Sequence, residues 1–237
     1  MIKSYKLRRN ISNAVVYVIL AVMGIIWISP LVWMVLHSFR GEGTSAVHYL
    51  IPKTFTFQHY INLFTDTTIL NFPRWFLNTL VVAIFSCIIS TLSVLMVAYT
   101  FSRLRFKARK PLINIGMIIG MFPGFMTMIA IYYLLKAMSL TQTLPALVIC
   151  YSAGAGIGFQ ISKGFFDTIP RALDEAATID GATKNQIFWK IILPMSKPIV
   201  VYTVLTAFIG PWTDFILVKI IMGDARDNYT VSVGLQL

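Results

Sequence analysis

Charge is scarce in this sequence. Only 12% of its 237 residues are Asp, Glu, Lys or Arg, whereas 57% are hydrophobic. A soluble domain of this size carries roughly 25% charged residues, so about half of the expected charge is missing. This shortage excludes an ordinary soluble domain and indicates a protein that resides in a membrane.

Cysteine is equally scarce, and the sequence motifs of common enzymes are absent. The two cysteines, Cys87 and Cys150, both fall inside apolar runs, which argues against a disulfide framework or a cysteine metal site. The sequence has no G-x-x-x-x-G-K-[ST] phosphate-binding loop, no H-E-x-x-H pair and no nucleophile elbow. We therefore expect a protein that is not an enzyme and that holds neither a metal nor a cofactor of its own.

The apolar residues are gathered into five long runs. About 20 apolar residues, at a helical rise of 1.5 Å each, span the hydrocarbon core of a bilayer. Each run is close to that length, so we predict an all-α membrane protein with five transmembrane helices. The runs cover residues 14–36, 75–101, 111–135, 144–161 and 198–218.

The basic residues are distributed unevenly around these runs. The net charge is +11, and 14 of the 20 Lys and Arg residues fall in the N-terminal tail or in the segments after the second and fourth runs. Positively charged loops stay in the cytoplasm, so we place the N-terminus inside and interpret the excess as a topology signal, not as a nucleic-acid site. The first run exceeds the roughly 7–15 apolar residues of a signal peptide and is predicted to be an uncleaved helix.

This topology divides the chain into two parts. Residues 1–74 would hold the tail, the first helix and an extracytoplasmic segment that begins near Ser38. Residues 75–237 would form the main membrane domain, with a polar cytoplasmic loop at 164–197.

The loop at 164–197 carries the signals of two short helices joined by a tight turn. Pro170 suits the first turn of the first helix, and Gly181 can end that helix in the left-handed conformation. Thr183 and Gln186 have the spacing of a capping box that begins a second helix, which Pro194 is expected to end. Such a pair of helices on the cytoplasmic surface would suit the binding of a soluble partner.

Seven residues of this loop match a known signature in identity and spacing. They are Glu175, Ala176, Ala177, Gly181, Ile191, Leu193 and Pro194. At every position this pattern resembles the EAA signature of the permease subunits of ATP-binding-cassette (ABC) importers. Segments 28–39, 76–79 and 229–234 look like the maltose-type carbohydrate subclass of these permeases, so the resemblance covers nearly the whole chain.

The resemblance implies a fold, a set of partners and a location. The fold would be the type-1 ABC importer transmembrane domain, in which the EAA loop couples to an ATPase subunit. The chain would form half of the translocation pathway, beside a second homologous permease. Two ATPase subunits would bind ATP and Mg, and an extracytoplasmic solute-binding protein would deliver a maltose- or maltodextrin-type sugar. The location would be the cytoplasmic (inner) membrane of a prokaryote.

The resemblance also implies a sixth transmembrane helix and a cytoplasmic C-terminus. This sequence ends at Leu237, which the predicted topology places on the outer side. We therefore expect the main domain to be C-terminally incomplete, as a truncated form or a short variant.

Asp214 is the one acidic residue inside a predicted span. A carboxylate at the centre of a membrane helix costs roughly 2.5–3.5 kcal/mol, so Asp214 should face protein or water. It could line the substrate pathway with Trp212 and Phe215 and accept hydrogen bonds from sugar hydroxyls. Alternatively, it could stabilise the bundle near the outer interface by pairing with a polar neighbour or with Lys219. Its depth, about four turns beyond the start of the fifth run, favours the second interpretation.

Other functions stay open at this point. The chain could be an ABC importer permease for an amino acid, phosphate or polyamine, a channel or secondary transporter, or an integral membrane enzyme that uses Asp214. A channel or secondary transporter usually needs more ionisable residues inside its spans, and an enzyme would need a recurring pair of polar groups there. Co-purification with an ATPase subunit distinguishes an importer permease from the last two.

Overall fold

A computed structural model describes residues 2–42, 49–67, 70–154 and 158–236. Within these ranges every regular element is a helix, apart from one isolated antiparallel bridge between Arg40 and Phe55. The chain divides into two compact units, residues 1–66 and residues 67–237. The first unit holds helices α1 and α2, and the second unit holds the remaining helices.

The first unit consists of one long helix followed by a short capping segment. Helix α1 (Ile2–Ser38, 37 residues) contains the first predicted span, and its apolar side chains are exposed within the unit, as they would be toward lipid. Helix α2 (Gln58–Thr65) packs at its end, where the Ser38 and Tyr60 hydroxyl oxygens lie 2.7 Å apart.

Arg40 organises the connection between α1 and α2. Its side chain is only 2% exposed, and its Nη2 donates to the Tyr49 carbonyl at 2.9 Å. Its Nη1 lies 3.7 Å from the Glu42 carboxylate, and its own carbonyl lies 2.8 Å from Nε2 of His59. The Tyr49 hydroxyl donates to Glu42, and this bond lowers the pKa of the Glu42 carboxyl.

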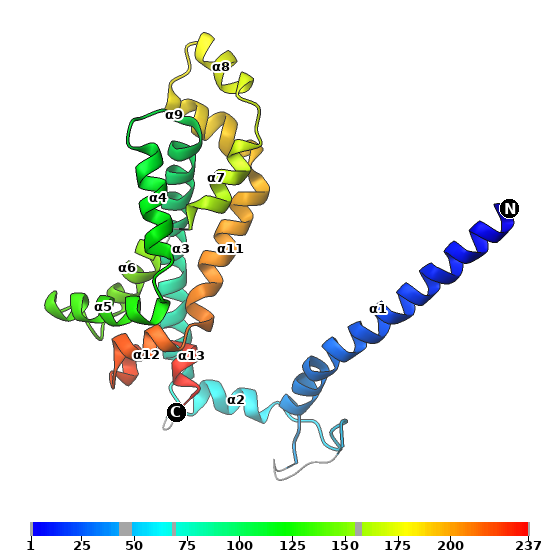
Figure 1. Cartoon of the computed structure of the whole chain (residues 1–237). Coiled ribbons are helices and arrows are strands. Elements are labelled where there is room, and N and C mark those ends of the chain that lie inside the picture. The colour runs from blue at the N-terminus through cyan, green and yellow to red at the C-terminus, as the bar shows by residue number, and fades with distance from the viewer. Residues whose placement is uncertain (1, 43–48, 68–69, 155–157, 237) are drawn as a thin grey trace. The chain divides into compact units, whose positions relative to one another are not determined.

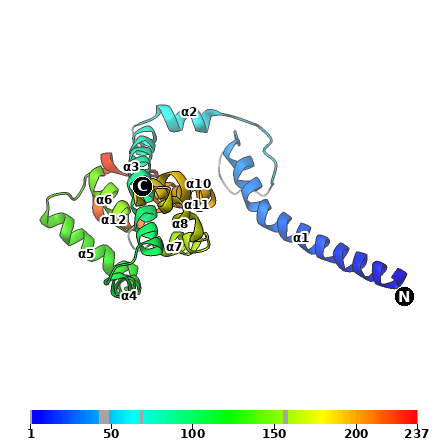
Figure 2. The same ribbon diagram turned by 90° about the horizontal axis from the view of Figure 1, so that it is seen from above.

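The second unit is built around one helix, α3 (Phe72–Arg103). One face of α3 buries small residues such as Ala83, Ser86 and Ser90, which let neighbouring backbones approach closely. The helices that pack on it are α6 (Leu144–Gly154), α7 (Phe159–Asp167) and α11 (Lys197–Thr213). Figures 1 and 2 show α7 and α11 on one side of α3 and α4 and α5 on another.

The third predicted span is not one straight helix. It is divided into α4 (Arg109–Gly120) and α5 (Gly124–Ala137), which meet at an angle of 98°. Pro123 explains the break, because it has no N–H to donate to an earlier turn and it disfavours a helical conformation at Phe122. The backbone of Pro123 is extended, with ψ 125°, where the second helix begins.

The fifth predicted span is also shorter than expected. Helix α11 ends at Thr213, Asp214 adopts an extended backbone, and a separate helix, α12 (Ile216–Met222), follows. Pro211 lies one turn before the break and leaves a carbonyl of α11 without its backbone donor. The expected helix from 198 to 218 is therefore wrong beyond residue 213.

The last segment folds back onto the beginning of α3. It contains a 3₁₀ turn, η2 (Arg226–Asn228), and helix α13 (Val231–Gly234). Trp75 Nε1 donates to the Arg226 carbonyl at 2.9 Å, and Asn78 Nδ2 donates to the Asp227 and Tyr229 carbonyls at 2.8 and 3.0 Å. Residues about 150 positions apart in the chain are thus joined at this end of the unit.

The described helices match the expected membrane class. Three are long and apolar enough to cross a membrane, and two bent pairs of helices could each supply one more span. The three are Arg8–Ser38, Phe72–Arg103 and Leu144–Asp167. The third includes residues 155–157, among them Gly156, which lie outside the described residues. An all-helical membrane protein with up to five spans is therefore confirmed.

The close approach of Gly234 to Trp75 leads to a first prediction. A Cβ at position 234 would lie 2.1 Å from Cε3 of Trp75, whose ring is buried and held by its indole hydrogen bond. We expect Gly234→Ala to lower the free energy of unfolding by about 1–3 kcal/mol, because the ring or the helix must shift. Thermal denaturation in detergent measures the effect.

Gly116→Ala is the matched control, since nothing lies within 4 Å of a Cβ at that position in α4. This change should be neutral or stabilising by up to about 1 kcal/mol. Equal denaturation midpoints for the two variants would show that the Gly234 contact is not tight.

Candidate functional site

The loop at 164–197 folds as two short helices joined by a tight turn. Helix α8 (Ala172–Ile179) is followed by Gly181, whose φ of +84° is the left-handed conformation predicted for it. Helix α9 (Lys184–Ile187) begins with a complete capping box between Thr183 and Gln186, with bonds of 3.3 and 2.8 Å. The predicted turn and capping box are therefore confirmed.

Pro170 lies just before α8 and not in its first turn, as the sequence had indicated. Arg171 is the N-cap of α8, and the Pro170 carbonyl accepts a hydrogen bond from the Leu173 N–H at 3.3 Å. Proline thus forms the tight turn that leads into the helix, where its fixed φ is equally favourable.

The second short helix continues past the position where it was expected to end. Helix α9 runs through a π-helical turn, η1 (Phe188–Ile192), into α10 (Leu193–Met195), so Pro194 lies within the helix. Because the π turn changes the hydrogen-bond spacing, Pro194 falls in the first turn of α10, where a missing N–H costs little. The chain then bends by 87° into α11 at the fully buried Ser196.

The seven signature residues divide between the surface and the core. The exposed members are Glu175, Ala176, Gly181 and Pro194. The buried or half-buried members are Ala177, Ile191 and Leu193. The loop therefore attaches to the bundle through one set of these residues and presents the other set outward.

The inner side of the loop packs into a hydrophobic core at the end of α3. Ile187, Phe188 and Ile192 are buried there, and the Phe188 ring lies 5.0 Å from that of Tyr99. The Tyr99 hydroxyl also donates to the Lys184 carbonyl at 3.0 Å. Movement of the second short helix would have to move this end of α3 with it, because interiors of this kind are tightly packed.

Arg103, in the last turn of α3, connects three segments. Its Nη2 donates to the carbonyls of Phe166 and Ile169 at 2.8 and 2.9 Å, and its Nη1 lies 3.3 Å from the Asp174 carboxylate. The Arg103 and Asp174 side chains are only 4% and 15% exposed. The guanidinium thus joins α3, the end of α7 and helix α8 through charge-assisted bonds.

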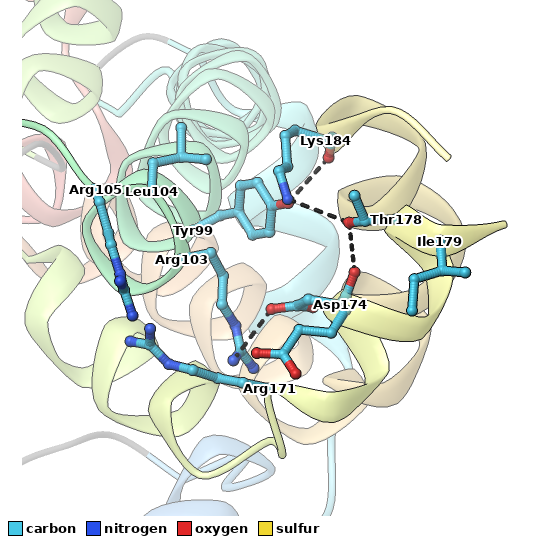
Figure 3. Close-up of a pocket in the computed structure, with 10 residues that line it drawn as sticks. Tyr99, Arg103, Leu104, Arg105, Arg171, Asp174, Thr178, Ile179 and Lys184 are labelled. Atoms are coloured by element: carbon cyan, nitrogen blue, oxygen red, sulfur yellow. Dashed lines mark hydrogen bonds and ion pairs between the residues drawn. The ribbon is translucent and has the colours of Figure 1, made fainter. Parts of the chain in front are cut away.

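A cavity of about 580 Å³ opens between the end of α3 and helix α8 (Figure 3). Its lining contains both charges, with basic side chains from the α3 end and from the loop and acidic ones from α8. The lining residues are Tyr99, Arg103, Leu104, Arg105, Arg171, Asp174, Glu175, Thr178, Ile179 and Lys184. At its edge Ile179 is 86% exposed, which is unusual for a large apolar side chain outside a membrane span.

This arrangement is suited to holding a partner. Among the described residues, no group of three or more His, Cys, Asp or Glu side chains could hold a metal ion. The cavity offers opposite charges and an exposed apolar side chain, which are the elements of a protein interface.

Sequence reasoning missed Arg103 and Tyr99 as members of this site. Arg103 was counted only as part of the basic excess after the second run. A basic residue in the last turn of a helix, beside orphan carbonyls, is a known stabilising position and could have drawn attention to it. No sequence signal showed that the carbonyls would be those of α7.

At the opposite end of the unit, Asp214 is engaged by protein groups. Its Oδ1 accepts from the Leu217 N–H at 3.1 Å, which caps α12, and its Oδ2 accepts from the Tyr151 hydroxyl at 3.2 Å. Lys219 does not pair with it; the ammonium donates to the Tyr229 hydroxyl at 2.7 Å and the Gly223 carbonyl at 3.3 Å.

The two aromatic residues proposed to accompany Asp214 lie in different environments. The Trp212 ring packs edge-on against Phe76, with ring centroids 5.2 Å apart, and its half-buried indole N–H has no hydrogen-bond partner among the described residues. Phe215 is 38% exposed. Asp214, Trp212 and Phe215 are close in sequence, but none of them lines the cavity beside α8 or the cavity between α3, α7 and α11.

A separate cavity lies between α3, α7 and α11. It has a volume of about 320 Å³ and is lined by hydroxyl side chains, by glycines and by the apolar residues Val94, Ile161 and Ala207. The hydroxyl side chains are those of Ser90, Ser162, Tyr202, Thr203 and Thr206. The buried Thr203 hydroxyl donates to the Ile199 carbonyl at 2.8 Å and lies 3.3 Å from the buried Ser162 hydroxyl, so both side chains have a hydrogen-bond partner within the membrane domain.

Two features stand out: apolar helices are broken within the bundle, and a pair of helices is exposed at one end. Both are expected of the membrane subunit of a transporter that works with a separate partner. Residues 91–236 match the family described as "Binding-protein-dependent transport system inner membrane component". The chain belongs to this family.

Curated relatives match along almost the whole chain. The galactooligosaccharides transport system permease protein GanQ of Bacillus subtilis is 36% identical over 99% of this chain and 83% of its own length. The maltodextrin transport system permease protein MalD of Streptococcus pneumoniae is 32% identical over 100% of this chain and 83% of its own. These matches confirm the resemblance to the carbohydrate subclass of ABC importer permeases.

A solved structure has the same fold. One chain of a bacterial ABC transporter involved in the import of the acidic polysaccharide alginate superposes with a TM-score of 0.83, at 21% identity, over 96% of this chain and 79% of that one. The protein is thus a permease subunit of an ABC importer with the type-1 membrane fold, and it is not an enzyme. A transporter of this family works with an ATPase, a second permease and a binding protein.

The position of Arg103 leads to a second prediction. Arg103→Gln leaves the Asp174 carboxylate unpaired and two carbonyls without their charged donor. Breaking a buried ion pair costs about 3–5 kcal/mol, and the partial exposure of Asp174 places this case near the lower value. Hydrogen exchange of the α8 amides should therefore become faster in the variant, with α3 itself unaffected.

Lys190→Gln provides the control, because Lys190 is an exposed residue of the same loop with no ion pair among those described. It should leave α8 exchange unchanged. Slow exchange of α8 in Arg103→Gln would show that the ion pair does not hold this helix.

Proposed function

We propose that this chain forms half of the translocation pathway of an ATP-driven sugar importer and receives the motion of the ATPase through the loop at 164–197. The observation that carries the proposal is the clamped loop: its outer face is free, while its inner face is joined to α3 by Arg103 and the Phe188 core. The complete EAA signature on this loop supports the same role.

The proposed orientation places the loop and the N-terminus in the cytoplasm. It is supported by the 14 Lys and Arg residues that fall in the tail and in the segments after the second and fourth predicted spans. The basic residues Arg103, Arg105 and Lys184 all line the cavity beside α8, so the cationic end of the unit is also the end that carries the loop.

The coupling role falls on the exposed signature residues. Glu175 and Gly181 would contact the ATPase directly or set the angle between α8 and α9, while Ala176 leaves room for a partner backbone. Ala177, Ile191 and Leu193 would keep the pair attached to the bundle, and the exposed Pro194 would shape the end of the second helix. A push on α8 would then reach α3 through Arg103, and from α3 it would reach the helices that pack on it.

We propose a maltose- or maltodextrin-type oligosaccharide as the substrate. The relative named for maltodextrin transport supports this choice. The relatives named for galactooligosaccharide transport and, in Streptomyces coelicolor, for diacetylchitobiose uptake support an oligosaccharide without favouring maltose. The hydroxyl-bordered cavity among α3, α7 and α11 would suit a sugar, because hydroxyl side chains can both donate and accept hydrogen bonds.

The proposed assembly contains this chain, one related permease, two ATPase subunits and an extracytoplasmic solute-binding protein. ATP and Mg would be bound only by the ATPase subunits, since this sequence has no phosphate-binding loop. Purification of the tagged chain from the membrane should recover these partners.

The left-handed turn at Gly181 leads to a third prediction. Gly181→Val should cost about 1 kcal/mol or more, because a β-branched residue is strained at positive φ. We expect normal abundance in the membrane, with sugar uptake and binding-protein-stimulated ATPase activity both lost.

Gly181→Asn should retain coupling, because asparagine tolerates the same conformation. Nothing lies within 4 Å of a Cβ at this position, so the two variants differ in backbone strain and not in a clash with the bundle. Full transport by Gly181→Val at normal abundance would refute the coupling role of the turn.

The contacts of Asp214 lead to a fourth prediction. Because both its carboxylate oxygens already accept bonds from protein groups, we propose that Asp214 stabilises the outer end of the domain rather than holding sugar. Asp214→Asn should therefore lower protein abundance, with uptake per molecule unchanged. Weaker uptake at unchanged abundance would instead assign Asp214, with Trp212 and Phe215, to the substrate pathway.

The substrate class is tested by deleting the gene in its source organism and growing the strain on a panel of single carbon sources. We expect loss of growth on maltodextrins and restoration by the wild-type chain. Growth unchanged on every sugar, with a defect on an amino acid, phosphate or polyamine source, would refute the carbohydrate assignment.

A further inference from the structure

Four basic residues line a second cavity, of about 570 Å³, between the end of α3 and the first turn of α4. They are Arg105, Lys107, Arg109 and Lys110. None of their side chains belongs to an ion pair of the described residues. Arg109 acts on Asp167 at a distance, but that carboxylate is already bound by Ser102 and Lys163, each at 2.6 Å.

The rest of the lining is apolar. It consists of Phe106, Pro111 and Ile113, and the Phe106 ring lies 5.7 Å from that of Phe101 in α3. Below the cavity α4 exposes a row of apolar side chains, each about half exposed. They are Leu112, Ile115, Ile118 and Ile119.

The cavity therefore has basic and apolar side chains in its lining, and the exposed apolar row of α4 continues from it. Figure 1 shows α4 beginning at the same end of the second unit as α8 and α9, and running away from that end along α3. In the orientation proposed above, on which this inference rests, the cations lie at the level of the inner-leaflet headgroups and the apolar row lies at the level of the acyl chains.

We propose that this cavity binds the headgroup of an anionic phospholipid, with the acyl chains lying along α4. Basic residues that only set the membrane topology would not need to line a cavity that also has apolar side chains in its lining. A soluble anion would make use of the cations only. A basic pocket beside a transmembrane helix at the cytoplasmic surface has the features that anionic lipid headgroups recognise.

The site also connects to the coupling loop through Arg105, which lines both cavities. Figure 3 shows the guanidinium groups of Arg105 and Arg171 turned toward one another beside α8. A lipid phosphate that neutralises Arg105 would reduce the repulsion between these two groups. An occupied lipid site would thereby favour the docked position of α8 and raise the ATPase activity that the loop controls.

The test uses the complete importer in nanodiscs of phosphatidylcholine, with or without phosphatidylglycerol. The variant is Lys107→Gln/Arg109→Gln/Lys110→Gln, which leaves Arg105 in place. Since each cation near an anionic membrane surface contributes about 1 kcal/mol, removing three should weaken phosphatidylglycerol binding about a hundredfold. Native mass spectrometry of the retained lipid measures this, and stimulated ATPase activity should lose its dependence on phosphatidylglycerol.

Arg8→Gln/Arg9→Gln/Lys197→Gln is the control, because it removes the same charge from exposed positions outside the cavity. It should retain the lipid. Cysteine labelling from each side establishes the orientation independently, so a wrong topology is distinguished from a missing lipid site. The proposal is overturned if both variants lose lipid equally, if phosphatidylcholine or inorganic phosphate binds as well, or if the first variant loses the ATPase subunits while keeping its lipid.

Discussion

The end of the bundle that carries the loop at 164–197 depends on the placement of one buried guanidinium. Arg103 can be buried only because two carbonyls and a carboxylate receive its N–H groups. Those acceptors lie at the end of α7 and in α8, so satisfying the charge also determines where the coupling loop begins. Without the interaction, the first short helix would be held by the packing of Ala177 and by two hydrogen bonds of 3.4 Å, from Arg171 to the Ser102 carbonyl and from Lys184 to the Thr178 hydroxyl.

The second short helix is attached in a different way, by hydrophobic packing. Ile187, Phe188 and Ile192 enter the core beneath α3, and the π turn brings them into register with it. One helix of the pair is thus held by charge and the other by burial. Because both contacts converge on the last turns of α3, the pair and that end of α3 should move as one body.

The parts of the structure that the sequence predicts are those determined locally. Long apolar runs define the spans, a glycine at position 181 takes a positive φ without strain, and the Thr183–Gln186 spacing specifies the cap of α9. The bend at Pro123 and the helix end before Asp214 were missed, although proline lies near both. A proline in a membrane helix is compatible with a straight, a kinked or a broken helix, and tertiary contacts such as Tyr151 with Asp214 decide among them.

The site itself was predictable only in part. The EAA spacing located the outward face, but Arg103 and Tyr99 lie 63 to 85 residues before the backbone carbonyls that they contact. Carbonyls carry no sequence identity, so no pattern of side chains reveals such a contact. The basic residues of the cavity at Arg105 were likewise counted only as part of the basic excess that indicates the topology, so the sequence did not reveal the cavity.

The central claim is that the loop and the end of α3 move together when the ATPase acts. Spin labels at Ile179 in α8 and at Met96 in α3, both exposed, report it directly once Cys87 and Cys150 are replaced. Pulsed electron-electron double resonance on the complete importer would compare the nucleotide-free state with a trapped ATP state. In the wild-type protein, the account predicts the same distance distribution between the two labels in both states. In Arg103→Gln, it predicts a shift between the states. A shift in the wild type as large as that in Arg103→Gln would contradict the account.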